Sequence, residues 1–317
     1  MCKNKIGFKV AATALLVFSL ALSGSARQKQ GEASGDGREV TILVTAHPHS
    51  SRTRAEAMKL KAEDFAVREE KLPQKIISVK PAQDAPPIIA VLLQDDLQTR
   101  VNNEIKGMKE FIRALPEGSR VMTGYITAGS LRVAQDFTTD RERAAESLRI
   151  IRGSASASPF NPYVELIEAL RKFDSQPAGR RLVLLVSDGL DTSRGIRSAS
   201  PKLSIDLDRA IREAQRRSVA VFSFYAPSVG LSGGSRFEAN LGQSSLNRLA
   251  DETGGEAFFS GFDFVTFDPY FKEFNELLGL QWLITYRSTN IGNSFREIEV
   301  TTEADVHLHH PDGYKPK

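Results

Sequence analysis

Two stretches of the chain place carboxylates directly after an apolar run. Residues 87–93 (PIIAVLL) are closely followed by Asp95 and Asp96, and residues 181–186 (RLVLLV) by Asp188. Apolar runs of this length are typical of strands buried on both faces, as in a parallel sheet covered by helices. Ligands bind to such sheets in the crevice at the carboxyl ends of the strands. The acids therefore predict a cation or ligand site at one edge of a sheet.

The same acids also have purely structural interpretations. Asp95 and Asp96 would stabilise the start of a following helix, where negative charge suits the positive end of the helix dipole. Asp188 and Gly189 would form an ordinary turn after a strand, with the glycine supplying a positive φ. Both interpretations stay open from the sequence alone.

The elements that must position these acids follow one another in a regular order. From Ile88 onward, apolar strands alternate with amphipathic helices, which predicts an α/β fold with a doubly wound, mostly parallel central sheet and helices on both faces. We expect strands near 88–93, 121–128, 182–186, 219–225, 282–287 and 295–301, and helices near 101–115, 139–151, 163–173, 206–217, 245–253 and 271–280.

The first residues have the composition of a secretory signal peptide. Three lysines precede an apolar stretch over 10–22, and small residues follow up to Ala26, where cleavage is expected. The apolar stretch is short for a membrane span, so a retained anchor is the alternative and no transmembrane span is expected after cleavage. The mature protein is therefore expected to be secreted or periplasmic.

The whole chain divides by composition into six segments. We expect a signal peptide over 1–26, a disordered lead-in over 27–38, a small β unit over 39–80, a linker over 81–87, an α/β domain over 88–290 and a C-terminal β extension over 291–317.

Charge and cysteine content exclude several classes of function. The chain has 42 Lys and Arg against 39 Asp and Glu. Three of the lysines lie in the leader, which has no acid, so 39 residues of each sign remain after cleavage and the formal net charge is zero. Because a nucleic-acid partner requires a basic surface, none is expected. Cys2 is the only cysteine, so the mature chain has no thiol chemistry. The sequence also lacks the nucleophile-elbow, Walker and His-Glu-x-x-His motifs, and we expect no enzyme.

The order of elements resembles the von Willebrand factor A (VWFA) domain, and in particular the secreted acidobacterial VWFA-related proteins. The resemblance covers nearly the whole mature chain. It is carried by residues 60–67 with 73–76, 91–97 with 137–141, and 249–258 followed by 284–287, 296–300 and 313–314.

The resemblance implies a metal site at the top of the sheet. In this family an Asp-x-Ser-x-Ser loop, a second-loop Thr and a third-loop Asp hold Mg²⁺ or a similar hard cation, with Mn²⁺ and Ca²⁺ as alternatives here. Asp95 and Thr99 match the first Asp and the second Ser, and Asp188 matches the third-loop Asp. Leu97 stands where the family has the first Ser, and it offers no oxygen, so the site is degenerate.

The remaining predicted contacts lie in the loops around this site. Ser156 or Ser158 would replace the second-loop Thr. Asp96, Asn161 and Asp191 would face a partner, which we expect to be a protein or a surface polymer. The sequence therefore predicts a non-enzymatic adhesion-type module, with a structural envelope protein carrying a vestigial metal site as the alternative.

Five histidines offer a second kind of metal chemistry. His307 and His309 would share one strand face, as would His47 and His49. Neither pair has a third ligand in its own segment, and zinc sites need three or four ligands, so ordinary surface histidines are expected.

Overall fold

The computed structural model describes residues 37–316, apart from 197–198, 230–234, 262–265 and 291. The expected signal peptide and nearly all of the expected lead-in lie outside the described residues. Within the described residues, no helix combines the length and the apolar character needed to cross a membrane.

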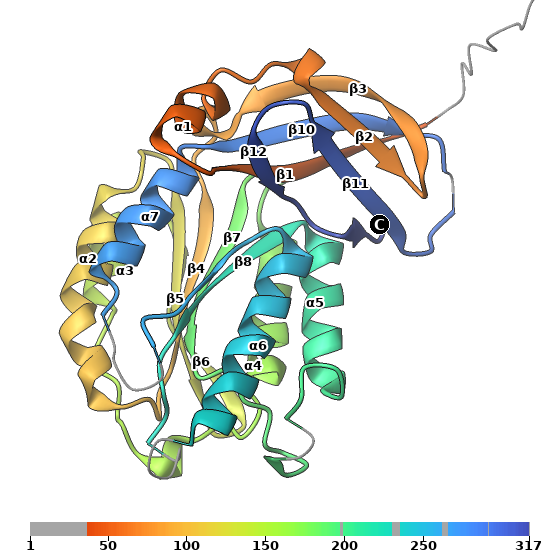
Figure 1. Ribbon diagram of the computed structural model, residues 1–317. Coiled ribbons are helices and arrows are strands. Elements are labelled where there is room, and N and C mark those ends of the chain that lie inside the picture. The colour runs from red at the N-terminus through yellow and green to blue at the C-terminus, as the bar shows by residue number, and fades with distance from the viewer. Residues whose placement is uncertain (1–36, 197–198, 230–234, 262–265, 291, 317) are drawn as a thin grey trace, which may run out of the picture. The chain divides into compact units, whose positions relative to one another are not determined.

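The α/β part of the chain is built on a six-stranded sheet with the order β6-β5-β4-β7-β8-β9 (Figure 1). Every neighbouring pair is parallel except β5 with β6, which run antiparallel. The central strands are fully buried, as their apolar runs predict. The strands are β4 (Ile88–Gln94), β5 (Arg120–Thr127), β6 (Ser130–Thr138), β7 (Arg181–Ser187), β8 (Val219–Tyr225) and β9 (Ala257–Phe258).

Helices cover both faces of this sheet, which confirms the expected layering. One face packs against α2 (Ile105–Ala114), α3 (Arg141–Glu146) and α7 (Asp268–Leu278). The other packs against α4 (Pro162–Lys172), α5 (Ile205–Arg217) and α6 (Arg236–Thr253). Alternate residues of each central strand enter the two cores, because successive side chains of a strand point to opposite faces. Short 3₁₀ turns, η1 (Ala62–Asp64), η2 (Ala82–Asp84), η3 (Thr99–Glu104), η4 (Ala155–Ala157) and η5 (Phe173–Ser175), complete the connections.

A second sheet is antiparallel throughout and has seven strands in the order β12-β1-β10-β3-β2-β11-β13. Helix α1 (Ser51–Ala57) follows its first strand. The strands are β1 (Arg38–Pro48), β2 (Phe65–Glu69), β3 (Leu72–Pro81), β10 (Gln281–Ser288), β11 (Arg296–Thr302), β12 (Val306–His309) and β13 (Gly313–Tyr314).

This sheet corrects the expected domain boundaries. The β unit over 39–80 and the extension over 291–317 are not separate, because β1 pairs with β10 and β2 pairs with β11. Strand β10 was expected inside the α/β domain and instead lies in the antiparallel sheet. Each strand alone has one apolar face, and pairing buries these faces in a shared core that includes Val44, Trp282 and Ile284. The fold is therefore mixed α/β: residues 88–258 form a sheet that is parallel except at β5–β6, and the chain ends form an antiparallel sheet that the expectation of a doubly wound parallel sheet did not include.

A buried arginine joins the two sheets. Arg180 precedes β7 and is 3% exposed. Its guanidinium donates to Gln281 Oε1 at 2.7 Å, to the carbonyl of Ala82 at 3.3 Å and to the carbonyl of Leu278. The antiparallel sheet thus lies at the amino ends of the parallel strands, and their carboxyl ends point away from it (Figure 1).

Candidate functional site

The strand order has a topological switch point between β4 and β7. From β4 the chain continues to β5 on one side, and from β7 it continues to β8 on the other. Loops that leave adjacent strands in opposite directions open a crevice at the carboxyl ends, and this is where open α/β sheets bind ligands. Gln94 ends β4, and Ser187 ends β7. The acids that follow them are therefore brought to the same edge, as predicted.

A pocket of about 190 Å³ opens at this edge. The polar side chains around it come from five separate segments, and Phe160 and Leu190 add apolar surface. The polar lining residues are Gln94, Ser158, Asp188, Thr192, Ser228 and Glu238.

Gln94 connects the two strand ends. Its Nε2 donates to Asp96 Oδ1 at 2.8 Å, and its Oε1 accepts from Ser187 Oγ at 2.6 Å and from the backbone N–H of Asp188 at 3.3 Å. Sequence reasoning missed this residue. The available signal was a polar side chain at the last position of an apolar strand, where burial requires hydrogen-bonding partners.

Asp96 and Asp188 form a pair of buried acids beside the pocket. They are 1% and 4% exposed. Burial, followed by the charge of Asp96, raises the pKa of Asp188 to about 6, although hydrogen bonds from the Leu190 backbone and Ser228 act in the opposite direction. Burial also raises the pKa of Asp96, against hydrogen bonds from Gln94 and Ser158. Neither acid forms an ion pair among the described residues, so no cationic side chain offsets their mutual repulsion.

Asp95 lies in different surroundings. It is fully buried, and Arg149 holds it through two bonds, Nη1 to Oδ1 and Nη2 to Oδ2, each at 2.9 Å. Arg152 adds its backbone N–H to Oδ1 at 2.9 Å and its Nε to Oδ2 at 3.3 Å. Because the guanidinium groups already neutralise this carboxylate, Asp95 does not fit as the first ligand of a cation.

The rest of the expected first-loop ligand set does not assemble either. Leu97 is fully buried in the core, and Thr99 is exposed at the start of η3. The trio of Asp95, Thr99 and Asp188 therefore does not fit a hard cation. The oxygen atoms near Asp188 that could ligate a cation belong to Asp96, Ser158 and Ser228.

The expected second-loop and partner-facing residues divide into two groups. Ser158 lines the pocket, whereas Ser156 is exposed and its hydroxyl lies 2.9 Å from that of Ser154. Asp96 is 1% exposed and Asn161 and Asp191 are each 6% exposed, so the expectation that these three side chains face a partner is wrong.

Asn161 and Asp191 have structural roles. Asn161 caps α4 by accepting from the backbone N–H of Tyr163, and its Nδ2 donates to Asp206 at 2.8 Å. Asp191 accepts from the hydroxyl groups of Ser193 and Ser204 at 2.6 and 2.7 Å. These bonds fix the loops that frame the pocket.

Two glycines let α6 approach the Asp188 loop closely. A Cβ on Gly242 would lie 1.9 Å from the carbonyl oxygen of Asp188. Gly189 has a φ of +70°, and a Cβ there would lie 2.5 Å from the carbonyl oxygen of Gly242. Tyr163 donates to the carbonyl of Gly189 at 2.6 Å. The position of Asp188 therefore depends on backbone contact between the loop and the helix.

Comparisons with known proteins give partial structural matches. No protein-family model matches the chain, and no curated protein does. Among solved structures, the conserved hypothetical protein BatB from Bacteroides thetaiotaomicron is 13% identical, covering 62% of this chain and 98% of that one, with a TM-score of 0.43. An aerotolerance-related membrane protein from Bacteroides fragilis is 14% identical, covering 61% and 98%, with a TM-score of 0.41. The VWA domain of SpRpn10 is 13% identical, covering 51% and 83%, with a TM-score of 0.34.

Proposed function

We propose that this chain is a non-enzymatic interaction module of the von Willebrand A type, which acts outside the cytoplasm and binds its partner at the pocket between β4 and β7. The single observation that carries this proposal is the pair of buried acids, Asp96 and Asp188, beside an open pocket at the switch point. The signal-like leader supports export.

The chemistry of the pocket favours a hard divalent cation as the link to the partner. Asp96 and Asp188 would supply carboxylate oxygens, and Ser158 and Ser228 would supply hydroxyl groups. Mg²⁺ binds through one or two carboxylates and keeps several waters, one of which an acidic group of a partner protein or surface polymer can replace. This ligand set uses Asp96 in place of Asp95.

The test is thermal unfolding of the full chain in EDTA and in millimolar Mg²⁺, Mn²⁺ or Ca²⁺. A cation that binds only the native state raises the unfolding temperature. We expect a rise in the unfolding temperature that disappears in Asp96→Asn and in Asp188→Asn. The control variant Asp136→Asn, which changes an exposed carboxylate near Lys172, should keep the rise. A rise that survives both pocket variants would contradict the proposed ligands.

One observation favours a second function, that of a structural envelope protein with a vestigial site. The ion pair with Arg149 occupies the carboxylate of Asp95, which the family resemblance implies as a metal ligand. Under this alternative no cation changes the unfolding temperature, and partner capture is equal in EDTA and in Mg²⁺.

A further inference from the structure

A second group of ligating side chains lies far from the switch point, where the two sheets meet. His47, Glu256 and Glu273 each offer one ligand atom, and the three atoms lie within 4.8 Å of one another. The Nε2 atom of His47 is 3.7 Å from Glu256 Oε1 and 3.9 Å from Glu273 Oε1. No two of these residues are close in sequence, so their convergence is a property of the fold.

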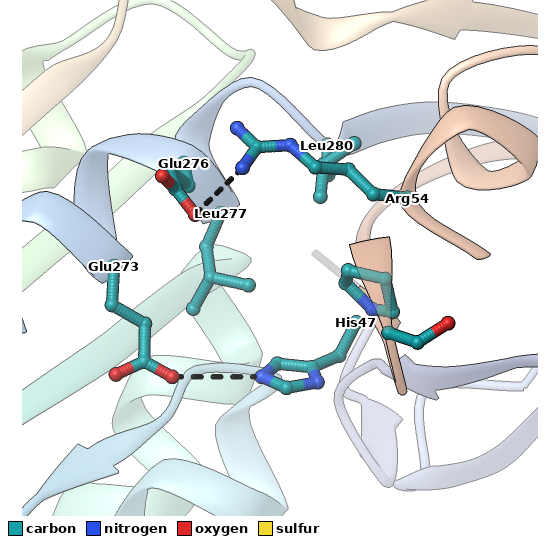
Figure 2. Close-up of a pocket in the computed structure, with 8 residues that line it drawn as sticks. His47, Arg54, Glu273, Glu276, Leu277 and Leu280 are labelled. Atoms are coloured by element: carbon teal, nitrogen blue, oxygen red, sulfur yellow. Dashed lines mark ion pairs between the residues drawn. The ribbon is translucent and has the colours of Figure 1, made fainter. Parts of the chain in front are cut away.

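Three different elements position the group. His47 lies near the end of β1, Glu256 directly precedes β9, and Glu273 lies in α7. Figure 2 shows His47 and Glu273 pointing toward each other across a pocket of about 180 Å³. On the other side of this pocket Arg54 pairs with Glu276 at 2.8 Å, so those two charges satisfy each other.

The donor set determines the class of ion. One imidazole with two carboxylates suits zinc and similar transition metals, whereas Mg²⁺ and Ca²⁺ prefer oxygen ligands alone. Zinc bonds of about 2.1 Å place tetrahedral ligand atoms roughly 3.4 Å apart. The separations of His47 Nε2 from the two glutamate oxygens are only slightly wider, and Glu273 has a long side chain that is 44% exposed and can adjust.

Glu256 carries a carboxylate that is only partly satisfied. Its Oε1 atom faces His47 Nε2, and its Oε2 atom is buried with no hydrogen-bond partner among the described residues. A buried carboxylate oxygen without a partner is costly, and coordination of an ion would satisfy the carboxylate. The His47 ring also lies 5.7 Å from that of His309, and His307 stands opposite His47 in the β1–β12 pairing. These two imidazoles flank the group without belonging to it.

We propose that His47, Glu256 and Glu273 bind one Zn²⁺ ion, with water in the fourth position. The ion fastens β1 of the antiparallel sheet to α7 and to the loop before β9. It therefore stabilises the junction of the two sheets and is independent of any cation at the switch point.

The test is a zinc titration of the full chain, prepared without a histidine tag and stripped of metal, followed by calorimetry and by the visible spectrum after Co²⁺ substitution. We expect one equivalent of zinc to bind and to raise the unfolding temperature. His47→Ala and Glu273→Gln should each weaken binding by at least about 100-fold and abolish the tetrahedral Co²⁺ spectrum.

Two matched variants control for nonspecific effects. His49→Ala removes an exposed imidazole two residues from His47, and Glu276→Gln removes a carboxylate from the same pocket. Both should bind zinc like the unmodified chain. Absence of zinc binding, or zinc binding that His47→Ala and Glu273→Gln leave unchanged while both variants remain folded, would overturn the proposal.

Discussion

Asp95 and Asp96 are adjacent in sequence but face opposite electrostatic surroundings. Asp95 accepts charge-assisted bonds from Arg149 and Arg152, whereas Asp96 is held by neutral groups and lies close to the charge of Asp188. The first acid is thus a structural anchor for the loop over 149–153, and the second has no cationic partner among the described residues.

We predict that Asp95→Asn destabilises the fold by about 2–4 kcal/mol, because it leaves the guanidinium of Arg149 without its buried partner. The midpoint of urea unfolding measures this loss. Asp136→Asn, which removes only an exposed carboxylate 3.8 Å from Lys172, should change stability by less than about 0.5 kcal/mol. Equal midpoints for the two variants would contradict the anchoring role.

The buried carboxyl group of Glu165 in α4 should make the free energy of unfolding depend on pH. It is 3% exposed, its Oε2 atom has no hydrogen-bond partner in the described part of the chain, and burial raises its pKa to about 7. The native state therefore binds this proton more tightly than the unfolded state, so the contribution of Glu165 to stability falls as the pH rises from about 4.5 through 7.

Glu165→Gln should remove this dependence. We expect the variant to unfold at the same urea concentration as the unmodified chain near pH 4, and to be more stable by about 1–3 kcal/mol at pH 8. Urea titrations at pH 4, 6 and 8 measure the difference. A difference that does not grow with pH would show that Glu165 titrates normally.

At the scale of elements, the contact of α6 with the loop after β7 fixes the position of Asp188 in the pocket. Gly242→Ala would place a methyl group against the Asp188 carbonyl and force the helix or the loop to move. We expect a loss of about 1–3 kcal/mol in stability and a weaker cation effect on the unfolding temperature. Ser244→Ala, on an exposed position of the same helix, should do neither.

The elements that could be predicted from sequence are those with a local signal. The buried runs of β4 and β7 and the helical spacing in α2 need no distant partner to be recognised. The choice between Asp95 and Asp96 has no such signal, because it depends on Arg149 and on a neighbouring strand that the chain reaches much later. The same holds for His47, since its neighbours Glu256 and Glu273 lie more than two hundred residues away.

At the scale of the whole described chain, residues 37–316, the first and last segments complete each other. β1 pairs with β10 over eight residues, from Arg38 with Ser288 to Thr45 with Gln281. No local pattern in the sequence specifies this pairing, because the two strands are separated by the entire α/β part. The expected separation of an N-terminal unit from a C-terminal extension was therefore wrong in topology, although β10 and β11 themselves were expected near 282–287 and 295–301.

A chain that ends at Leu280 should lose the antiparallel sheet, since β1 and β3 would each lose their contact with β10. We expect hydrogen exchange to show that the backbone amides of β1 and β3 have lost their protection and exchange as fast as amides in an unfolded segment. A chain that ends at Tyr314 keeps every strand and should retain their protection. Protection of β1 in the shorter chain would contradict this account.

The position of β1 also determines how the protein responds to mechanical force. β1 lies between β12 and β10, and its hydrogen bonds run perpendicular to its axis. A pull applied at residue 37 along that axis would load these bonds together in shear, so they would have to break as a group. Forced unfolding depends on the height of the unfolding barrier, and shear of a two-sided strand makes this barrier high. Tension on this end of the chain would therefore load β1 before it reaches the pocket between β4 and β7.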